Sequence, residues 1–377
     1  MRVAQVLHRL TWAGAEVLAA DLARALRDRH ECVFICLDGV GGLGDALRSE
    51  GFAVECVHRR PGLDRRAIRT LAGLWRRYQI DLIHAHQYGP FAYAAMSRGW
   101  RRQPRLLFTE HGRHVPDVVS WKRRLANRWL LGPGDAVTAV SEHVKRALVT
   151  HEGLPADRIE VIPNGIAPGR FARDAAARAR LRSDWGVADD DVLIVQVARF
   201  HPVKDHATGA RAFAEAVRTA PAKWVLVGDG EGRAAMEQLV RELGVADRVI
   251  FTGVRTDIPA VLAASDILML SSVSEGLPVT VLEAMAAGLP VASTAAGGAV
   301  EAVEDGVTGL LTPVADAPAL AASLRRLIAD AGLRATLGDA GRRRVLAGFS
   351  QAAMHAAFAT RYDRLARAAS IVPRQAR

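Results

Sequence analysis

Two carboxylates separated by seven residues frame a short segment that could bind a phosphate and a sugar. Glu275 and Glu283 flank the sequence Gly-Leu-Pro-Val-Thr-Val-Leu. The apolar run 267–270 is predicted to be a buried strand and 279–287 a helix, which makes the residues between them a strand-to-helix turn. Such a turn presents backbone N–H groups at the positive end of the helix dipole, where phosphate binds readily. One carboxylate could then reach a sugar on one side of a diphosphate, and the other a ribose on the opposite side.

Two cations are predicted at the same edge of the sheet. Arg199 and Lys204 follow the predicted strand 192–197, with a proline between them. The planar fork of Arg and the point charge of Lys both suit a diphosphate, although a solvated loop would carry the same residues. Two carboxylates alone would also suit the acid and base of a sugar hydrolase. The cations favour a different role, in which the glutamates orient a donor molecule.

The first half of the chain offers two weaker candidates. Gly14 follows the first predicted strand and opens a helix, so the backbone there could approach a ligand closely, or simply turn. His111 follows the predicted strand 105–109, where an imidazole could contact a sugar or be purely structural.

Short Val/Ile/Leu runs alternate with amphipathic segments, a pattern typical of parallel sheets covered by helices on both faces. We expect an α/β protein with two doubly wound, Rossmann-like domains, 1–165 and 166–349, facing each other across a cleft. A final helix, 350–367 within the segment 350–377, is expected to pack back on the first domain. In such sheets ligands bind beyond the carboxyl ends of the strands. The strands are predicted at 3–7, 32–37, 54–57, 82–85, 105–109, 136–140, 159–162, 192–197, 224–227, 249–252, 267–270 and 290–292.

The composition suits two globular cores, because the chain has 377 residues of which 50% are hydrophobic. Its three cysteines show neither a disulfide framework nor metal-ligand spacing, which favours a reducing, cytoplasmic setting. The chain begins directly with a predicted strand and has no apolar run of about 18 residues, so neither a signal peptide nor a membrane span is expected.

The net charge of +10 is concentrated in the first half, where residues 1–165 hold 25 Lys and Arg against 17 Asp and Glu. Two segments there, 65–78 and 121–129, interleave cations with an apolar stripe. Each stripe could pack in the core, or each segment could attach to an anionic membrane and bring a lipid-linked acceptor within reach. No nucleic-acid-binding module is visible, so a nucleic-acid partner is not expected.

Three further patterns suggest other functions less well. The glycines of 228–232 fit a dinucleotide fingerprint poorly, because Arg233 occupies the position of its last small residue. His84 and His86 are predicted to share one strand face, and a structural role is favoured over zinc because no third ligand accompanies them. The run 189–191 precedes a strand, which indicates a solvated turn, so no metal is expected.

Taken together, these motifs resemble the family 4 retaining glycosyltransferases of the GT-B fold. The resemblance spans nearly the whole chain, and the block from Glu275 to Glu283 is its most specific part. The segment 111–117 also resembles sugar transferases of exopolysaccharide biosynthesis. The matching motifs are Gly14-Ala-Glu, Thr109-Glu-His-Gly, Val161-Ile-Pro-Asn-Gly, Arg199 with Lys204, Gly228-Asp-Gly, Phe251-Thr-Gly, Glu275-Gly-Leu-Pro and Glu283-Ala-Met.

The resemblance implies a role for each candidate. Arg199 and Lys204 would hold the diphosphate of the donor, and Glu283 its ribose. Glu275 would hold the transferred sugar together with the backbone of Gly276, Leu277, Pro278 and Val279. His111 would face that sugar from the acceptor domain, and Gly14 would lie against the phosphate, although the family often has Gly-Gly where this chain has Ala13-Gly14.

The implied reaction moves a sugar from a nucleotide-diphosphate sugar, with UDP favoured, to a glycan or lipid-linked acceptor. The anomeric configuration is retained, and neither a cofactor nor a metal is needed. Acceptor attack from the face that the diphosphate leaves, with a phosphate oxygen taking the acceptor proton, is the family's usual explanation of retention. A non-hydrolysing nucleotide-sugar epimerase and a catalytically silent sugar-nucleotide binder remain the alternatives.

Overall fold

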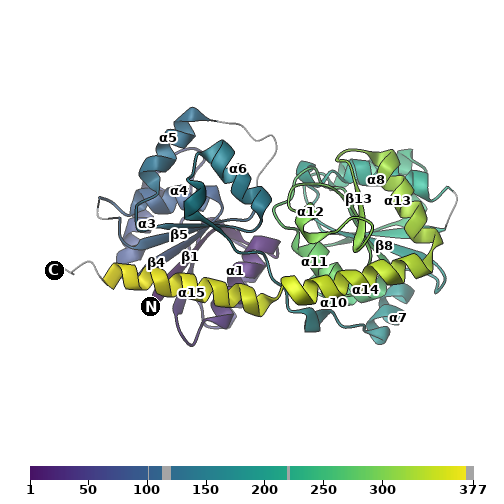
Figure 1. The fold of residues 1–377 in the computed structure, drawn as a ribbon, viewed down its shortest axis with the longest axis horizontal. Coiled ribbons are helices and arrows are strands. Elements are labelled where there is room, and N and C mark those ends of the chain that lie inside the picture. The colour runs from purple at the N-terminus through teal and green to yellow at the C-terminus, as the bar shows by residue number, and fades with distance from the viewer. Residues whose placement is uncertain (101, 113–119, 219–220, 371–377) are drawn as a thin grey trace. The chain divides into compact units, whose positions relative to one another are not determined.

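The computed structural model describes residues 1–100, 102–112, 120–218 and 221–370. The chain divides into two compact units, one formed by 1–164 with 352–377 and the other by 165–351 (Figure 1). Among the described residues, each unit contains one parallel sheet, which confirms the predicted α/β class and its two Rossmann-like domains.

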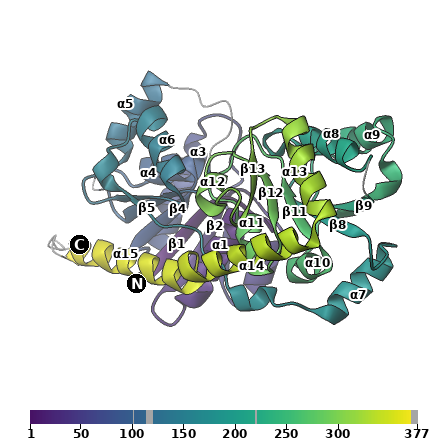
Figure 2. The same cartoon turned by 45° about the vertical axis from the view of Figure 1, so that its right-hand side comes forward.

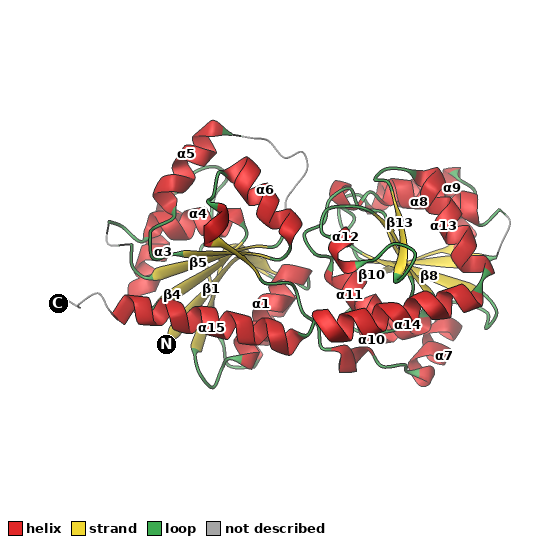
Figure 3. Ribbon diagram, viewed as in Figure 1, coloured by secondary structure: helices red, strands yellow, loops and turns green. Residues whose placement is uncertain are grey.

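The sheet of the first unit has seven parallel strands in the order β3-β2-β1-β4-β5-β6-β7. The helices α3, α4, α5 and α6 cover one face, whereas α1 and α15 lie on the other (Figure 3). The strands are β1 (Arg2–Leu10), β2 (Glu31–Val40), β3 (Ala53–Cys56), β4 (Leu82–His86), β5 (Arg105–Glu110), β6 (Ala136–Ala139) and β7 (Ile159–Val161). The helices are α1 (Gly14–Ala25), α2 (Gly42–Ser49), α3 (Arg65–Arg77), α4 (Tyr88–Ser97), α5 (Trp121–Leu130), α6 (Glu142–Glu152) and α15 (Gln351–Ser370), with a 3-10 turn at Ala156–Arg158.

The sheet of the second unit has six parallel strands in the order β10-β9-β8-β11-β12-β13. Figure 2 labels β9, β8, β11, β12 and β13 in this order. The helices α8, α9 and α13 lie on one face and α7, α10, α11 and α14 on the other (Figure 3). The strands are β8 (Val192–Val197), β9 (Ala222–Val227), β10 (Val249–Gly253), β11 (Ile267–Leu270), β12 (Val291–Thr294) and β13 (Gly309–Thr312). The helices are α7 (Ala175–Asp184), α8 (His206–Ala216), α9 (Arg233–Glu242), α10 (Ile258–Ala264), α11 (Val279–Ala286), α12 (Ala299–Ala302), α13 (Ala317–Ala329) and α14 (Ala331–Gly348); 3-10 turns lie at Pro168–Phe171, Pro202–Lys204 and Ala246–Arg248.

Both sheets reverse their strand order once, between β1 and β4 in the first and between β8 and β11 in the second. At such a switch point the connections leave toward opposite faces and open a crevice beyond the carboxyl ends of the two strands. The topology therefore marks one binding position on each sheet before any side chain is considered.

Helix α15 returns to the first unit after the chain has built the second. Its Tyr362 is fully buried, and the hydroxyl lies 3.0 Å from Gln5 Nε2 of β1 and 2.7 Å from His84 Nδ1 of β4. Arg29 and Arg361 add ion pairs to Asp363 and Glu160. These contacts fix α15 on the first sheet, along the face where Figures 1 and 2 both show it.

The chain passes between the units twice, near residues 164–165 and 351–352. Two backbone hydrogen bonds join the crossing segments: Ile166 N donates to Phe349 O, and Gln351 N donates to Ile166 O. A Cβ on Gly165 would lie 2.5 Å from Ser350 O, so glycine is required where the two segments pass each other. Within the described residues, no helix is both long enough and apolar enough to cross a bilayer.

Candidate functional site

The predicted cation and carboxylate meet at the switch point of the second sheet. Lys204 ends the 3-10 turn that follows β8, and Glu275 lies in the loop that follows β11. Lys204 Nζ is 2.6 Å from Glu275 Oε1, and the Ser272 hydroxyl donates to the same oxygen at 2.5 Å. Glu275 is only 8% exposed, whereas the Lys204 side chain is 23% exposed. The site therefore contains a partly accessible ammonium held by a nearly buried carboxylate.

The two loops that carry this pair are bonded to each other. Val273 N donates to Val203 O at 2.9 Å, and the Ser271 hydroxyl donates to Lys204 O at 3.1 Å. Gln196 Nε2, at the buried end of β8, donates to the Ser271 hydroxyl at 3.2 Å. These bonds hold the Lys204 backbone in place independently of its side chain.

A third loop, after β12, supports Glu275 from its backbone. Gly298 N donates to Glu275 O at 3.0 Å, and Gly297 has a φ of +55°. A Cβ on Gly297 would lie 2.1 Å from Glu275 O, which no side chain could tolerate. Close backbone packing thus explains this glycine, which the sequence interpretation did not include.

Arg199 lies in the same loop as Lys204 but is exposed. Its backbone is braced by the loop after β9, where Phe200 N donates to Asp229 O at 3.1 Å. A Cβ on Gly228 would lie 2.1 Å from Ala198 O, and one on Gly230 2.7 Å from Phe200 O. Gly228 and Gly230, which partly match a dinucleotide-binding fingerprint, therefore allow the close backbone packing of the loop that carries Arg199.

The phosphate-ready turn forms as predicted between β11 and α11. Gly276, Leu277 and Pro278 are buried, Val279 is the first helical residue, and Pro278 is the N-cap. The N-cap residue Pro278 makes no side-chain hydrogen bond to the first N–H groups of α11, which follow it. Glu283 lies half-buried on this helix, just over one turn beyond its start.

Sequence reasoning missed His206, the first residue of α8, which follows Lys204 by two residues. Its ring stacks on Phe200 at 4.6 Å between centroids and is buried. Burial, with a smaller contribution from the charge of Lys204, lowers the pKa of His206 to about 4. The ring is therefore neutral at physiological pH and serves as an aromatic support for the Arg199 loop.

In the first unit, His111 lies directly after β5, as predicted, and Gly14 is the exposed first residue of α1. The His111 Nε2 atom lies 2.9 Å from His86 Nδ1, and the two rings stack. Burial lowers the pKa of His111 to about 4. Residues 113–117 of the segment that resembles exopolysaccharide enzymes lie outside the described residues.

His84 and His86 share one face of β4, as their spacing predicts, with ring centroids 4.1 Å apart. Burial lowers the pKa of both rings well below the usual value. Their ring nitrogens bond to Tyr362, Thr109, Gln5 and His111. This network occupies the ring nitrogens that a metal would need.

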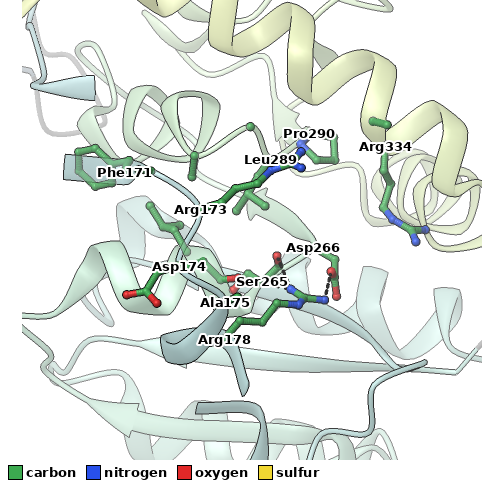
Figure 4. A pocket seen from close by; sticks show the side chains of 16 residues that line it. Phe171, Arg173, Asp174, Ala175, Arg178, Ser265, Asp266, Leu289, Pro290 and Arg334 are labelled. Atoms are coloured by element: carbon green, nitrogen blue, oxygen red, sulfur yellow. Dashed lines mark hydrogen bonds and ion pairs between the residues drawn. The ribbon is translucent and has the colours of Figure 1, made fainter. Parts of the chain in front are cut away.

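A pocket of about 360 Å³ lies elsewhere on the second unit (Figure 4). It is lined by Asp266 and Pro290, which immediately precede β11 and β12, and by Arg173 and Arg178. Arg178 Nη2 is paired with Asp266 at 2.8 Å, the bond drawn in Figure 4. The pocket therefore opens at the amino ends of the strands, on the opposite edge from Lys204 and Glu275.

Comparison with known proteins gives the family. Residues 12–170 match the model of "Glycosyltransferase Family 4", and residues 177–344 match that of "Glycosyl transferases group 1". The N-acetyl-α-D-glucosaminyl L-malate synthase of Bacillus anthracis is 30% identical over 84% of this chain and 85% of its own length. A GDP-mannose-dependent α-(1-6)-phosphatidylinositol monomannoside mannosyltransferase of Mycobacterium tuberculosis is also 30% identical, over 78% of each chain.

The structural comparison agrees. Anabaena HepE, solved in complex with UDP-glucose, superposes with a TM-score of 0.85 and 25% identity, over 96% of this chain and 99% of its own. This chain consists of two Rossmann-like units, and its Lys204 and Glu275 lie at the switch point of the second. The chain belongs to the family 4 glycosyltransferases and is a sugar-transferring enzyme of the GT-B fold.

Proposed function

We propose that this enzyme transfers a sugar from a nucleotide-diphosphate sugar to a glycan or lipid-linked acceptor, with retention of the anomeric configuration and without a metal. The observation that carries the proposal is the Lys204–Glu275 pair at the switch point of the second sheet. When a donor enters, a phosphate oxygen and a sugar hydroxyl take over contacts that the two side chains make with each other.

The proposed reaction follows from the charged groups at this site. The bond between the anomeric carbon and the phosphate oxygen breaks, and its electron pair leaves with the nucleoside diphosphate. Lys204, Arg199 and the N-terminal N–H groups of α11 stabilise that developing charge without reorganising. The acceptor oxygen bonds to the anomeric carbon from the same face, and its proton passes to a phosphate oxygen. Glu283 binds the ribose, Glu275 the sugar, and Gly14 approaches the phosphate.

Relatives support two different donor bases. HepE was solved with UDP-glucose, and the mycobacterial relative is named as GDP-mannose-dependent. We favour a UDP-sugar because HepE matches over nearly the whole chain.

A thermal-shift screen of UDP-, GDP- and ADP-sugars tests the donor, because ligand binding to the folded state raises its apparent stability. We expect a UDP-sugar to give the largest shift and Lys204→Ala to abolish it. Incubation of that donor without acceptor then separates the classes. A product epimerised at the sugar would support an epimerase instead. Donor binding without transfer to any acceptor in a panel of glycans and lipid-linked sugars would indicate a silent binder.

We also propose that the acceptor is presented at an anionic membrane surface, on the cytoplasmic side, and that α5 makes the contact. The two basic segments differ in the structure. Helix α3 buries its apolar stripe, including Leu71 and Trp75, so its arginines form the solvent-exposed face of an amphipathic helix. Helix α5 leaves Trp121, Leu125 and Trp129 exposed by 69%, 50% and 73%.

The inward face of α5 is polar and fixed. Asn127 is fully buried between Tyr88 and Glu152, and Arg123 pairs with Glu152 at 2.9 Å. Residues spaced by four lie on one helix face, so this anchoring directs the two tryptophans and Leu125 to the opposite side. Exposed Lys122, Arg124 and Arg128 flank that ridge, and residues 121–130 contain no acidic residue. Aromatic rings beside cations suit the interface of an anionic bilayer.

Liposome sedimentation tests this contact. We expect binding to vesicles that contain phosphatidylglycerol, weak binding to pure phosphatidylcholine, and a large loss in a Trp121→Ser/Trp129→Ser variant. Arg124→Gln/Arg128→Gln should weaken binding more than the charge-matched α3 variant Arg66→Gln/Arg69→Gln, although each cation near the surface contributes only about 1 kcal/mol. Leu63→Ser, at another exposed apolar residue of the same unit, is the control. Binding that ignores lipid charge and salt would exclude the proposal.

A further inference from the structure

A continuous chain of hydrogen bonds crosses the buried face of the first sheet and ends at His111. Its members come from β1, β4, β5, β6 and α15, and all except His111 are at most 3% exposed. Neighbouring strands place Gln5 opposite His84, His86 opposite Thr109, and Thr109 opposite Thr138. In order, the chain runs Thr138, Thr109, His84, Tyr362, Gln5, His86 and His111, with consecutive polar atoms 2.6, 2.6, 2.7, 3.0, 2.8 and 2.9 Å apart.

The three histidine rings in this chain of hydrogen bonds are neutral. Burial lowers the pKa of His84 and His86 well below the usual value and that of His111 to about 4. Burial likewise raises the pKa of the Tyr362 phenol, so its proton stays in place. A neutral imidazole has one N–H donor and one bare acceptor nitrogen, so each ring passes the direction of hydrogen bonding from one side to the other.

The direction is set at the far end of the chain. The Thr138 hydroxyl has one further acceptor, Phe108 O at 3.5 Å, and we assign its proton to this long bond because a carbonyl can only accept. The Thr109 hydroxyl then donates to Thr138, and His84 Nε2–H donates to Thr109. His84 Nδ1 is therefore bare and accepts the Tyr362 hydroxyl proton.

The same direction continues through the glutamine. Tyr362 Oη accepts from Gln5 Nε2, which leaves Gln5 Oε1 to accept from His86 Nε2–H. His86 Nδ1 is then bare and accepts from His111 Nε2–H. His111, the last residue of the hydrogen-bond chain, is therefore the Nε2–H tautomer and has a lone pair on Nδ1.

That Nδ1 atom is buried and has no hydrogen-bond partner within the described structure. A small cavity adjoins the ring, lined by His111 and His86 together with Leu18, Asn164 and Phe358. The reverse direction would leave a buried N–H without an acceptor, which is rarer in proteins than an unsatisfied acceptor. A buried acceptor is stabilised when a donor supplied by a ligand reaches it.

We infer that Tyr362, through Gln5 and His86, fixes His111 as a neutral hydrogen-bond acceptor for a hydroxyl of the transferred sugar. His111 on this view receives a hydrogen bond and does not act as an acid. Tyr362 is a positioning residue, contributed by the returning helix α15. The sugar contact rests on the proposed function, whereas the tautomer is a property of the free protein.

The direct test is ¹⁵N NMR of the full-length protein with labelled histidine, with the His111 signals assigned by their loss in His111→Gln. We expect an unprotonated Nδ1 and a protonated Nε2 from pH 6 to 8. A protonated Nδ1, or a ring that charges in this range, would overturn the inference.

Tyr362→Phe tests the relay. Without the phenol, the Gln5 amide keeps only the Cys32 sulfur, a weak acceptor, so it can turn and His86 and His111 are free to adopt the opposite tautomers. We expect a mixed His111 tautomer population and a rise of about fivefold to tenfold in the KM for the donor, the loss of one neutral hydrogen bond, with a smaller change in kcat.

Tyr93→Phe is the matched control, because this buried tyrosine of the same unit bonds to Gly62 O and lies outside the relay. It should change neither the tautomer nor the KM. An unchanged His111 tautomer in Tyr362→Phe would refute the relay, even if the KM rose. The expected tautomers in a protein that transfers no sugar would instead contradict the proposed function and leave the relay standing.

Discussion

At the scale of single residues, Lys204 is the side chain whose removal should separate activity from folding. Lys204→Ala removes the cation that neutralises the departing diphosphate, so we expect turnover to fall at least a hundredfold or so. Glu275 keeps its bond from Ser272, and the loss of one partly exposed partner should lower the free energy of unfolding by only about 1–2 kcal/mol. Steady-state kinetics and urea unfolding measure the two effects. Arg211→Ala, an exposed cation on α8, is the control.

The two glutamates should differ in the kinetic parameter that they control. Glu283→Ala removes a proposed contact to the ribose, which is bound equally before and during the reaction, so mainly the KM for the donor should rise. Glu275→Ala removes a proposed contact to the sugar that reacts, so mainly kcat should fall. Initial rates at varied donor concentration distinguish the two. Equal changes in both parameters for both variants would contradict this division of labour.

The residues at the second switch point could be predicted because local sequence places them. Strand-end positions follow from short apolar runs, and the turn before α11 follows from Gly276 and Pro278. The relay could not be predicted, because Tyr362 lies 357 residues from Gln5 and nothing local marks it as a partner. Ser272 precedes Glu275 by three residues, so the sequence could have suggested it as a hydrogen-bond donor to this carboxylate. A serine in a loop, however, has too many possible partners for a firm prediction.

At the scale of elements, most strands were predicted to within a few residues, and β8 and β11 match their predicted bounds. The strand predicted at 290–292 begins instead at Val291, because Pro290 has no N–H to donate to a ladder. The edge strand β13 was missed, since Gly309–Thr312 is too short to give a periodic signal. The apolar stripe of α5 was the pattern that sequence could not interpret, because the same spacing describes a buried face and an exposed one.

The position of α5 depends on a buried ion pair at its C-terminal end. The side chains of Arg98 and Asp135 are each 1% exposed and form two bonds of 2.7 and 2.8 Å, while Arg98 also donates to Leu130 O. Asp135→Asn leaves the guanidinium buried without its counter-charge, which should cost about 3 kcal/mol of unfolding free energy. Urea unfolding measures this loss, and Asp157→Asn, at an ionisable residue of the same unit outside this pair, should change it little. A loss of less than about 1 kcal/mol would mean that water or another group replaces the carboxylate.

At the scale of the whole molecule, buried neutral histidines in both units couple folding to pH. His111 and His206 have pKa values of about 4 in the folded protein, below the ordinary value of 6.5. Between those values the unfolded chain binds more protons than the folded one, so the free energy of unfolding increases with pH. The stabilisation is therefore complete above about pH 6.5 and is lost as the pH falls toward 4. Each ring contributes on the order of a few kcal/mol at the acid limit.

His206→Phe separates the second unit's share of this effect. The substitution keeps a ring against Phe200 and removes the titrating group, whose Nε2 has no partner in the described part of the chain. We therefore expect the variant to resist unfolding at pH 5 better than the wild type, with little difference at pH 8. Urea unfolding at closely spaced pH values from 4.5 to 8 gives the slope, which should decrease by up to one proton in the variant. An unchanged slope would mean that the His206 ring has the same pKa in the folded enzyme as in the unfolded chain.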